Sequence, residues 1–268
     1  MNRIDWRHAQ LAANNDGEAW ELYHENSKTN RYDAPLSSEE VRQRMLDSWP
    51  SLPYEGYPTI GLPTSAALDV PLSAAILGRH TARSLKPAQL TLAQLSALLN
   101  YSYGQTRDWS EQGYPRPFRV VPSGGALFPL EIYFHTNRVD GLVPGWYHYS
   151  AAGNLLHRLK EGDDSRRLAF ALVQQNLALD ASVVFVISAL FARSTFKYRE
   201  RGYRFTLIEA GHVGQNLCLV AQGLGMGVVP LGGFLDREVD ALLSLDGLMH
   251  STLYMLAVGA EPPGPESP

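Results

Sequence analysis

A tight turn that leads directly into a strand is the feature that most restricts the fold of this chain. Residues 122–129 read Pro-Ser-Gly-Gly-Ala-Leu-Phe-Pro, with a proline at each end. The strand-like run Leu-Glu-Ile-Tyr-Phe-His follows at once over residues 130–135. Because Gly124 and Gly125 carry no Cβ, the backbone of this turn can approach a flat or charged ligand closely. We therefore expect a ligand to lie against the turn.

Length and charge limit what that ligand can be. The chain has 268 residues, of which 45% are hydrophobic, enough for one large domain or for one domain with an extension. Its formal net charge is -4, without a long run of either sign. This composition argues against a nucleic-acid or membrane surface as the partner, and it favours a small neutral or mildly charged ligand.

Cysteine content and the N-terminal residues indicate the compartment. Cys218 is the single cysteine and lies in an apolar run, so we expect a buried core residue and no internal disulfide. The first residues lack the apolar core of a signal peptide, and no apolar run is long enough to span a bilayer. These features predict a cytoplasmic protein.

Helix and strand signals predict an extension followed by an α+β domain. Residues 16–50 predict two helices with polar faces, and Leu-Ser-Ser-Glu-Glu-Val at 36–41 marks the start of the second, with serine caps and early glutamates. Residues 50–71 are rich in Pro, Gly and Tyr and predict an extended segment lying over the body. We therefore divide the chain into an extension (1–71), a domain (72–260) and a disordered tail (261–268).

Within the domain, strands alternate with helices. A capping box, Thr91-Leu92-Ala93-Gln94, predicts a short helix that runs to about Asn100. Strands are expected at 130–136, 146–149, 183–189 and 252–258, and amphipathic helices at 165–177 and 203–224. The last helix carries small residues on one face, because they recur at three- and four-residue spacing: Ala210, Gly211, Gly214, Cys218 and Ala221. That stripe predicts close packing, either within the chain or across a dimer axis.

Three further segments are candidates to meet the turn at one planar, anionic ligand. Arg79-His80-Thr81-Ala82-Arg83-Ser84 suits a phosphate, because guanidinium forks grip its oxygens and the hydroxyls add hydrogen bonds. Residues 223–233, Gly-Leu-Gly-Met-Gly-Val-Val-Pro-Leu-Gly-Gly, follow a helix and offer backbone N–H groups. The fourth segment is Phe-Lys-Tyr-Arg-Glu-Arg-Gly-Tyr at 196–203.

Several common sites are excluded by their missing partners. The glycines of 223–233 have the wrong spacing for a Rossmann fingerprint, and they end a helix where that motif opens one. The sequence contains no P-loop and no G-x-S-x-G elbow. Its eight histidines show no zinc-ligand spacing, so no metal site is expected.

Taken together, the segments resemble the nitroreductase-like flavoprotein superfamily, and most closely its SagB-type or McbC-like dehydrogenase branch, the thiazole and oxazole oxidases. The resemblance runs from about Tyr23 to Gly259. Its pieces are Tyr-His-Glu-Asn-Ser-Lys at 23–28, Arg79 to Ser84, Pro-Ser-Gly-Gly-Ala at 122–126, Lys197-Tyr198 with Arg-Gly-Tyr-Arg at 201–204, Gly211-His212 with Gln215-Asn216, and Gly225-Met226-Gly227. The order and spacing of the whole set is specific, whereas any single piece is not.

The resemblance implies a nitroreductase-like α+β fold, with a mixed, mostly antiparallel sheet flanked by helices, in an intertwined homodimer that holds FMN at its interface. It implies that Arg79, His80, Thr81 and Arg83 hold the FMN phosphate and ribitol. Pro122, Ser123, Gly124 and Gly125 are then expected against the isoalloxazine, from the partner subunit. The remaining expected FMN contacts are Gln215, Gly225, Gly227, Val228, Pro230, Leu231 and Gly232. Many relatives carry a basic residue near the C-terminus, where this chain reads Val-Gly-Ala-Glu at 258–261.

The resemblance also implies a reaction. The branch oxidises azoline rings, made from Cys, Ser or Thr, to thiazoles and oxazoles: a base removes a proton from one ring carbon, and hydride leaves the next carbon for flavin N5, with oxygen reoxidising the flavin. Lys197 and Tyr198 match the catalytic Lys-Tyr pair of the branch. Either a neutral Lys197 or a Tyr198 phenolate beside a Lys197 cation can serve as the base, and the sequence does not choose between them.

The substrate and partners follow as expectations. A peptide or a carrier-protein-tethered azoline is the expected substrate, and a cyclodehydratase or peptide synthetase is a candidate partner. Two other enzymes stay open on the same fold: an NAD(P)H-dependent nitro- or quinone reductase, and a SagB-type dehydrogenase acting on another modified amino acid. A scaffold that binds or has lost FMN is the non-enzymatic alternative.

Overall fold

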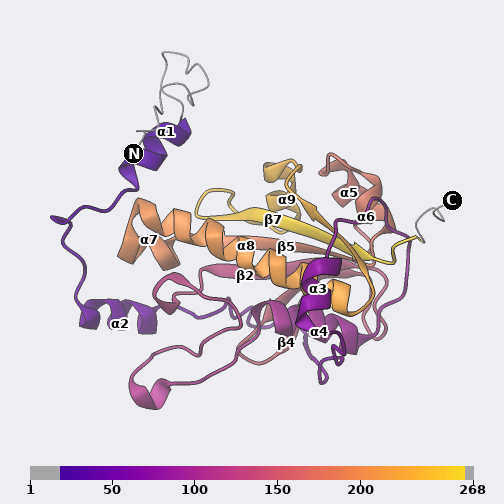
Figure 1. Cartoon of the computed structure of the whole chain (residues 1–268), viewed down its shortest axis with the longest axis horizontal. Helices are drawn as coiled ribbons and strands as arrows, with labels where there is room; N and C mark the ends of the chain where they lie inside the picture. The colour runs from indigo at the N-terminus through magenta and orange to yellow at the C-terminus, as the bar shows by residue number, and fades with distance from the viewer. Residues whose placement is uncertain (1–18, 263–268) are drawn as a thin grey trace, which may run out of the picture.

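The computed structural model describes residues 19–262, and its centre is one seven-stranded sheet (Figure 1). The strand order is β1-β4-β3-β2-β5-β7-β6, and all the pairings between these strands are antiparallel. The strands are β1 (Thr59–Gly61), β2 (Leu130–Thr136), β3 (Gly145–Ser150), β4 (Leu155–Glu161), β5 (Val183–Leu190), β6 (Gly227–Leu231) and β7 (His250–Gly259). The predicted α+β class is confirmed, and the sheet is antiparallel between all of these strands.

Both faces of the sheet are buried, because alternate side chains of each central strand enter two different cores. Ile132 and Phe134 of β2 join one core with α4 (Leu92–Tyr103) and α8 (Glu200–Gly223). Tyr133 joins the other, with α5 (Ser165–Phe170), α6 (Asn176–Asp180) and α9 (Asp236–Leu242). The sheet is therefore the middle of three layers, with α8 lying lengthwise across one face (Figure 1).

The two long helices begin and end for local reasons. Thr91 caps α4, accepting from the backbone of Gln94, whose side chain returns a bond to the Thr91 backbone, as the capping box predicts. The helix runs three residues beyond the expected Asn100. At the end of α8, Gly225 adopts a φ of 68° and Met226 N–H donates to Ala221 C=O, the pattern of a Schellman cap.

The small-residue stripe of α8 is used within the chain. Ala210, Gly214, Cys218 and Ala221 are buried, and a Cβ built on Gly214 would lie 2.5 Å from the ring of Tyr254 in β7. Only Gly211 of the stripe is exposed. The stripe therefore serves close packing within the chain, because it lets α8 approach its own sheet, and the dimer axis that the resemblance favours for this helix stays a prediction.

The prediction of a single helix at 165–177 is wrong, because the chain forms two short helices there, α5 and α6. Between them, Leu235 N–H donates to Ala171 C=O and Val173 N–H donates to Gly233 C=O. These bonds to a distant loop replace the helical pairing that the amphipathic pattern predicts. Strands β1 and β4 gave no signal that we recognised in the sequence.

The residues predicted to form the N-terminal extension (1–71) contain α1 (Ala19–Asn26), α2 (Ser38–Asp47) and β1, and α3 (Leu72–Gly78) follows them. Ser37 and Glu40 form a capping box at the start of α2, where a helix start was expected. The predicted extended segment 50–71 pairs with β4 at the sheet edge through β1. Residues 1–18, and residues 263–268 of the predicted disordered tail, lie outside the described residues.

Candidate functional site

The Pro-Ser-Gly-Gly turn is a short 3-10 helix (Gly124–Ala126) with an unusual backbone. Gly125, Ala126 and Phe128 have φ values of 65°, 54° and 46°. Positive φ costs little at glycine but is uncommon at Ala and Phe, and such strain gathers at functional sites. The Ser123 hydroxyl fixes the turn by accepting a hydrogen bond from Phe128 N–H at 2.9 Å. The sequence therefore folds into a strained ledge at the start of β2.

The ledge meets the Lys-Tyr pair at Gly125. A Cβ built on Gly125 would lie 2.6 Å from Tyr198 Oη and 2.9 Å from Lys197 Nζ, closer than real side chains approach. Lys197 Nζ lies 5.0 Å from the centre of the Tyr198 ring, and that ring packs edge-on against Phe205 of α8. The structure therefore brings together Ser123, Gly125, Lys197 and Tyr198 within one chain. Only a glycine leaves room for both polar ends at this position.

A cavity of about 720 Å³ opens beside this meeting point. Pro122, Ser123, Gly125 and Lys197 line it, together with α2 and residues 107–121. A second cavity, of about 420 Å³, is lined by Lys197 and Tyr198 with residues 29–36 of the extension. The Lys-Tyr pair therefore stands between two cavities, both walled partly by the extension.

The extension closes the site by packing and by a buried arginine. Val41 and Met45 of α2 form a small core with Leu127, against which Tyr198 packs. Arg116 donates to Leu127 C=O at 2.9 Å and to Met45 C=O at 3.0 Å. The end of α2 is thereby tied to the ledge.

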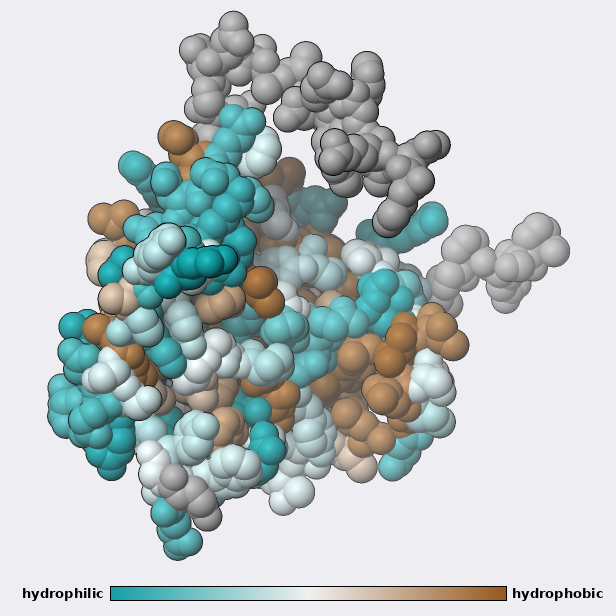
Figure 2. Space-filling model, turned by 60° about the vertical axis from the view of Figure 1, so that its left-hand side comes forward, coloured by the Kyte–Doolittle hydropathy of each residue, from teal (hydrophilic) through white to brown (hydrophobic). Residues whose placement is uncertain are grey.

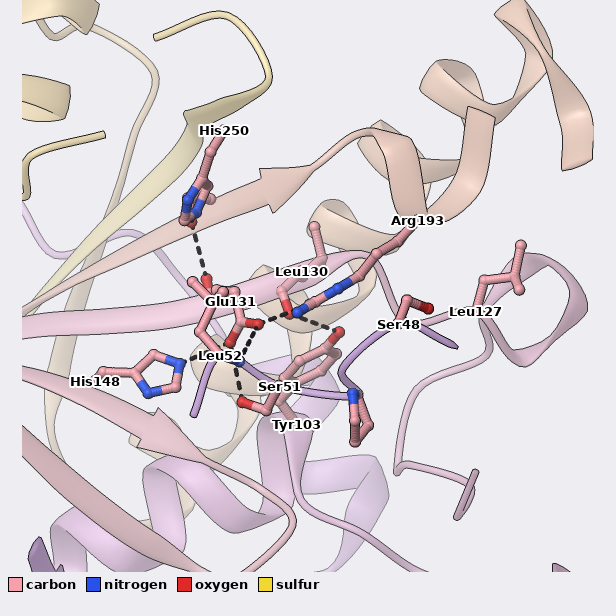
Figure 3. Close-up of polar contacts among 12 residues, drawn as sticks. Ser48, Ser51, Leu52, Tyr103, Leu127, Leu130, Glu131, His148, Arg193 and His250 are labelled. Carbon is pink, nitrogen blue, oxygen red and sulfur yellow. Dashed lines mark hydrogen bonds and ion pairs between the residues drawn. The ribbon is translucent and has the colours of Figure 1, made fainter. Parts of the chain in front are cut away.

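A buried ion-pair network holds α7 (Ala192–Tyr198), the helix that ends in the Lys-Tyr pair (Figure 3). Arg193 NH1 lies 2.7 Å from Glu131 Oε1, and His148 Nε2 lies 2.6 Å from Glu131 Oε2. From the extension, Leu52 N–H and the Ser51 hydroxyl donate to the same carboxylate at 2.9 and 3.1 Å. Burial would raise the pKa of Glu131, but the charges of Arg193 and His148 outweigh it and hold that pKa well below its ordinary value.

A second buried carboxyl group supports the ledge from α8. Glu209 is 2% exposed and accepts a hydrogen bond from the Tyr103 hydroxyl at 3.1 Å. Burial raises the pKa of Glu209 to about 7, against the lowering effect of hydrogen bonds from Ser123 and Tyr103 and of the Arg119 charge. The carboxyl group therefore titrates near neutrality.

The expected phosphate-binding residues lie at a different place. Arg79, Gln215 and Pro230 line a cavity of about 460 Å³ along α8, together with Tyr254. His80 is paired with Glu261, its Nε2 lying 2.8 Å from Oε2, and its pKa is raised because Gly78 C=O and the Glu261 carboxylate accept hydrogen bonds from the ring. Thr81 and Arg83 are exposed.

Most of the FMN contacts expected over residues 225–232 have structural roles within the chain. Gly225 caps α8, and a Cβ on Gly227 would crowd Ala82 and Leu85, so both glycines have local structural reasons. The side chains of Val228 and Leu231 are buried in the two cores, while Gly232 is exposed with open space around it. Within residues 19–262, Pro122, Ser123 and Gly125 of the turn therefore line one cavity, and Arg79, Gln215 and Pro230 line another.

The supporting carboxylates were missed in the sequence. Glu131 and Glu209 sit in an ordinary strand and an ordinary helix pattern, and their partners are distant in the chain. The sequence offered one indication of these two sites, because each glutamate occupies a position that the hydrophobic pattern assigns to the core. Among residues 19–262 no group of three His, Cys, Asp or Glu side chains is placed to hold a metal ion. None of the helices described has the length and hydropathy needed to cross a bilayer.

A model of the nitroreductase family matches residues 76–260, more than half of the chain. The chain therefore belongs to the nitroreductase family. MJ1384 of Methanocaldococcus jannaschii is 34% identical over 177 residues, which cover 66% of this chain and 86% of that protein.

Two relatives are named for the processing of peptide natural products. The trifolitoxin-processing protein TfxB of Rhizobium leguminosarum is 28% identical over 84% of this chain, and the microcin B17-processing protein McbC of Escherichia coli is 32% identical over 48%. The aligned parts span 61% of TfxB and 49% of McbC. The chain is therefore an McbC-like member of the superfamily.

Solved structures confirm the nitroreductase-like fold. A protein of Anabaena variabilis superposes with a TM-score of 0.71 at 23% identity, over 90% of this chain and 47% of its own. A chain of the E. coli microcin synthetase McbBCD complex, which has truncated pro-MccB17 bound, superposes with a TM-score of 0.60 at 21% identity, over 91% of this chain and 92% of its own. A Desulfovibrio desulfuricans protein in complex with FMN gives 0.50 at 18% identity, over 75% of this chain and 92% of its own.

Proposed function

We propose that this protein is an FMN-dependent dehydrogenase that oxidises thiazoline or oxazoline rings of a peptide or carrier-bound intermediate to the aromatic azoles. The observation that carries the proposal is the meeting of Gly125, Lys197 and Tyr198 beside the 720 Å³ cavity. The names of TfxB and McbC, which process peptide products, support the same class of substrate.

The residues present fit FMN. The glycine ledge leaves a space that a Cβ at Gly125 would fill, and Arg79 and Gln215 offer cationic and amide donors for a phosphate and its ribityl chain. FMN, when bound, takes up the two electrons that leave the azoline ring. Arg79, Gln215 and Pro230 would hold one part of the cofactor, and Ser123 with Gly125 the part nearer the Lys-Tyr pair.

The homodimer belongs to this proposal, because the two clusters line separate cavities of one chain. A second copy would bring the ledge of one subunit to the Arg79 cavity of the other. Helix α8 exposes Leu207 and Ile208, and α3 exposes Leu72, Ile76 and Leu77, the last at 86%. Hydrophobic side chains also gather on the right-hand side of the molecule in Figure 2. An uncovered apolar helix face supports association with a second copy.

The chain's own residues supply the acid–base chemistry. Lys197 Nζ or Tyr198 Oη accepts the proton from the ring carbon, and the close approach of both atoms to Gly125 supports a position for that carbon beside the ledge. Leu36, Val41 and Phe128 line the cavity and exclude water from the ring. A cyclodehydratase or a peptide synthetase is the proposed supplier of the azoline, and the cytoplasm is the proposed compartment.

Substitution of the pair tests the proposal. Lys197→Ala and Tyr198→Phe should each retain FMN, seen as flavin absorbance, and slow azoline oxidation at least ~100-fold, the scale of one lost acid–base group. Full activity in both variants would refute the assignment of the site. Rapid bleaching of the flavin by NADPH, without oxidation of any azoline, would instead identify a nitro- or quinone reductase.

A further inference from the structure

The 720 Å³ cavity is basic, although the chain as a whole is acidic. Four basic side chains line it, namely Arg42, Arg107, Arg119 and Lys197, and none of its lining residues is acidic. The formal net charge of the chain is -4, so the cavity has the opposite sign to the molecule. A concave surface of one sign concentrates ligands of the other sign.

Arg119 is the deepest of these cations. It is 8% exposed, its guanidinium lies 4.1 Å from the Tyr103 ring centre, and NH2 donates to Pro50 C=O at 2.9 Å. In the part of the chain that the structure describes, no carboxylate forms an ion pair with it. A guanidinium has five N–H donors, so the Pro50 carbonyl leaves Arg119 with most of its capacity free.

The carboxyl groups near Arg119 offset its charge only in part. Burial and the charges of Arg193 and Arg119 together lower the pKa of the neighbouring Arg116 to about 10, as expected where cations are crowded. The Glu131 carboxylate already pairs with Arg193 and His148 and accepts two hydrogen bonds from the extension. Glu209, whose pKa burial raises to about 7, is largely protonated below neutrality. The region therefore has an excess of positive charge.

The other two arginines lie at the exposed rim. Arg42 projects from α2, and Arg107 stacks at 5.4 Å from the Trp109 ring and 5.2 Å from the Phe118 ring. Stacking leaves the edge of a guanidinium free, and that edge matches the two oxygens of a carboxylate. A ligand entering the cavity thus passes two cations before it reaches Arg119 and Lys197.

We infer that the cavity binds a carboxylate of the substrate next to the ring that is oxidised, with Arg119 at its depth and Arg42 at its rim. The carboxylate is an Asp or Glu side chain flanking the azoline, or the C-terminal carboxylate of a short substrate. This inference rests on the proposed function and narrows its substrate to acidic azoline peptides.

The test compares thiazoline peptides that differ only in the residue flanking the ring: Asp, Asn or Lys, each with a C-terminal acid or amide. The FMN-loaded wild-type protein should oxidise an acid-bearing peptide with a kcat/KM about tenfold above its neutral counterpart, the effect of one charge-assisted hydrogen bond. A higher kcat/KM with Asp than with Asn identifies the flanking side chain as the bound carboxylate, and a higher kcat/KM with the acid than with the amide identifies the C-terminus. Equal rates for all six peptides would overturn the inference and leave the proposed function intact, whereas oxidation of none would refute both.

Charge reversal at the rim keeps the test independent of folding. Arg42→Glu should reduce kcat/KM for the Asp peptide about fivefold, the scale of an exposed ion pair, and should favour the Lys peptide. Arg44→Glu is the matched control, since it makes the same charge change on α2 but lies outside the 720 Å³ cavity, in a separate one lined by Asp47, Ala192, Arg193 and Phe196, and it should leave the preference unchanged.

Arg119→Gln separates substrate from cofactor. It should raise KM for the Asp peptide about tenfold while the affinity for FMN, measured by quenching of flavin fluorescence, stays at the wild-type value. A loss of FMN binding in Arg119→Gln or Arg42→Glu, without a change in peptide preference, would assign the cations to the cofactor phosphate and overturn the inference.

Discussion

Gly125→Ala is the substitution that most sharply probes how the ledge meets the Lys-Tyr pair. The added methyl group would lie 2.6 Å from Tyr198 Oη, whereas ordinary contact begins at 3.4 Å, so Oη must retreat by 0.8 Å (3.4 − 2.6). Lys197 Nζ, at 2.9 Å, must retreat by 0.5 Å (3.4 − 2.9). Because a misplacement of about 1 Å at a reacting group costs about 100-fold, we expect a loss of that order in kcat/KM.

Stability should fall far less than activity. Alanine at a φ of 65° costs about 1–2 kcal/mol, since its Cβ approaches the carbonyl oxygen in the left-handed region. In a chain of this size about 1 kcal/mol corresponds to a shift of roughly 2–4 °C in Tm. The methyl group meets the ends of two side chains and no backbone atom, so the backbone of the ledge and of α7 need not move.

Gly141→Ala is the matched control. Gly141 has a φ of 82°, and a Cβ there would meet nothing within 4 Å, so it carries the same backbone cost without touching the site. Both variants are compared by thermal unfolding and by initial rates of azoline oxidation with FMN. We expect similar losses of Tm and a loss of activity in Gly125→Ala only. Wild-type kcat/KM in Gly125→Ala, or an equal loss in Gly141→Ala, would refute the geometry.

Three further predictions follow from the supporting residues. Glu131→Gln leaves the Arg193 cation without its buried counter-ion and should cost about 3–5 kcal/mol. Since the pKa of Glu131 is depressed in the folded state, this contribution is fully present above about pH 4.5 and is lost progressively as the pH falls toward the folded pKa, so the gap between the urea midpoints of wild type and variant should be widest at pH 7 and narrower at pH 3. The pH dependence expected for Glu209 is the reverse: burial raises its pKa to about 7, so its ionisation destabilises the fold as the pH rises from about 4.5 to 7. The stability of Glu209→Gln relative to wild type should therefore increase by up to about 3 kcal/mol across that window. A stability difference that stays constant with pH would contradict the burial argument. Ile208→Glu, on the exposed face of α8, should convert the proposed dimer to a monomer in light scattering and reduce FMN content; an unchanged mass would place the interface elsewhere.

Features encoded by neighbours in the chain were predictable. The Thr91–Gln94 capping box gave the start of α4, and the strand at 130–136 was predicted at both ends, because a run without interruption follows the turn. The Ser37 cap of α2 belongs to the same class. In each case the residues that determine the structure lie within a few positions of one another.

Features that depend on distant contacts were not predictable. Glu131 has the place of an ordinary strand residue, and its partners Ser51 and His148 lie 80 residues earlier and 17 residues later. The helix predicted at 165–177 breaks because its middle pairs with residues 233–235, which no local pattern reveals. Small residues on α8 indicated close packing correctly, but the sequence does not say whether the close neighbour is the partner subunit or Tyr254 of the same chain.

The site was predicted in part for the same reason. Ser123, Gly125, Lys197 and Tyr198 come from two short motifs, and the structure brings them together. Arg79, Gln215 and Pro230 form a second cluster in another cavity, and their proposed union with the ledge requires a second copy of the chain. The sequence does not show which part of the extension lines the 720 Å³ cavity, since a polar helix with a few apolar residues, such as α2, fits any surface.

The most direct test of the proposed reaction is a mass measurement on a defined thiazoline peptide incubated with the purified protein in air. We predict the loss of two hydrogens from the ring when FMN is present, no change when FMN is removed, and a rate at least ~100-fold lower in Lys197→Ala and Tyr198→Phe. An unchanged peptide mass in the presence of a bound, air-oxidised flavin would contradict the account.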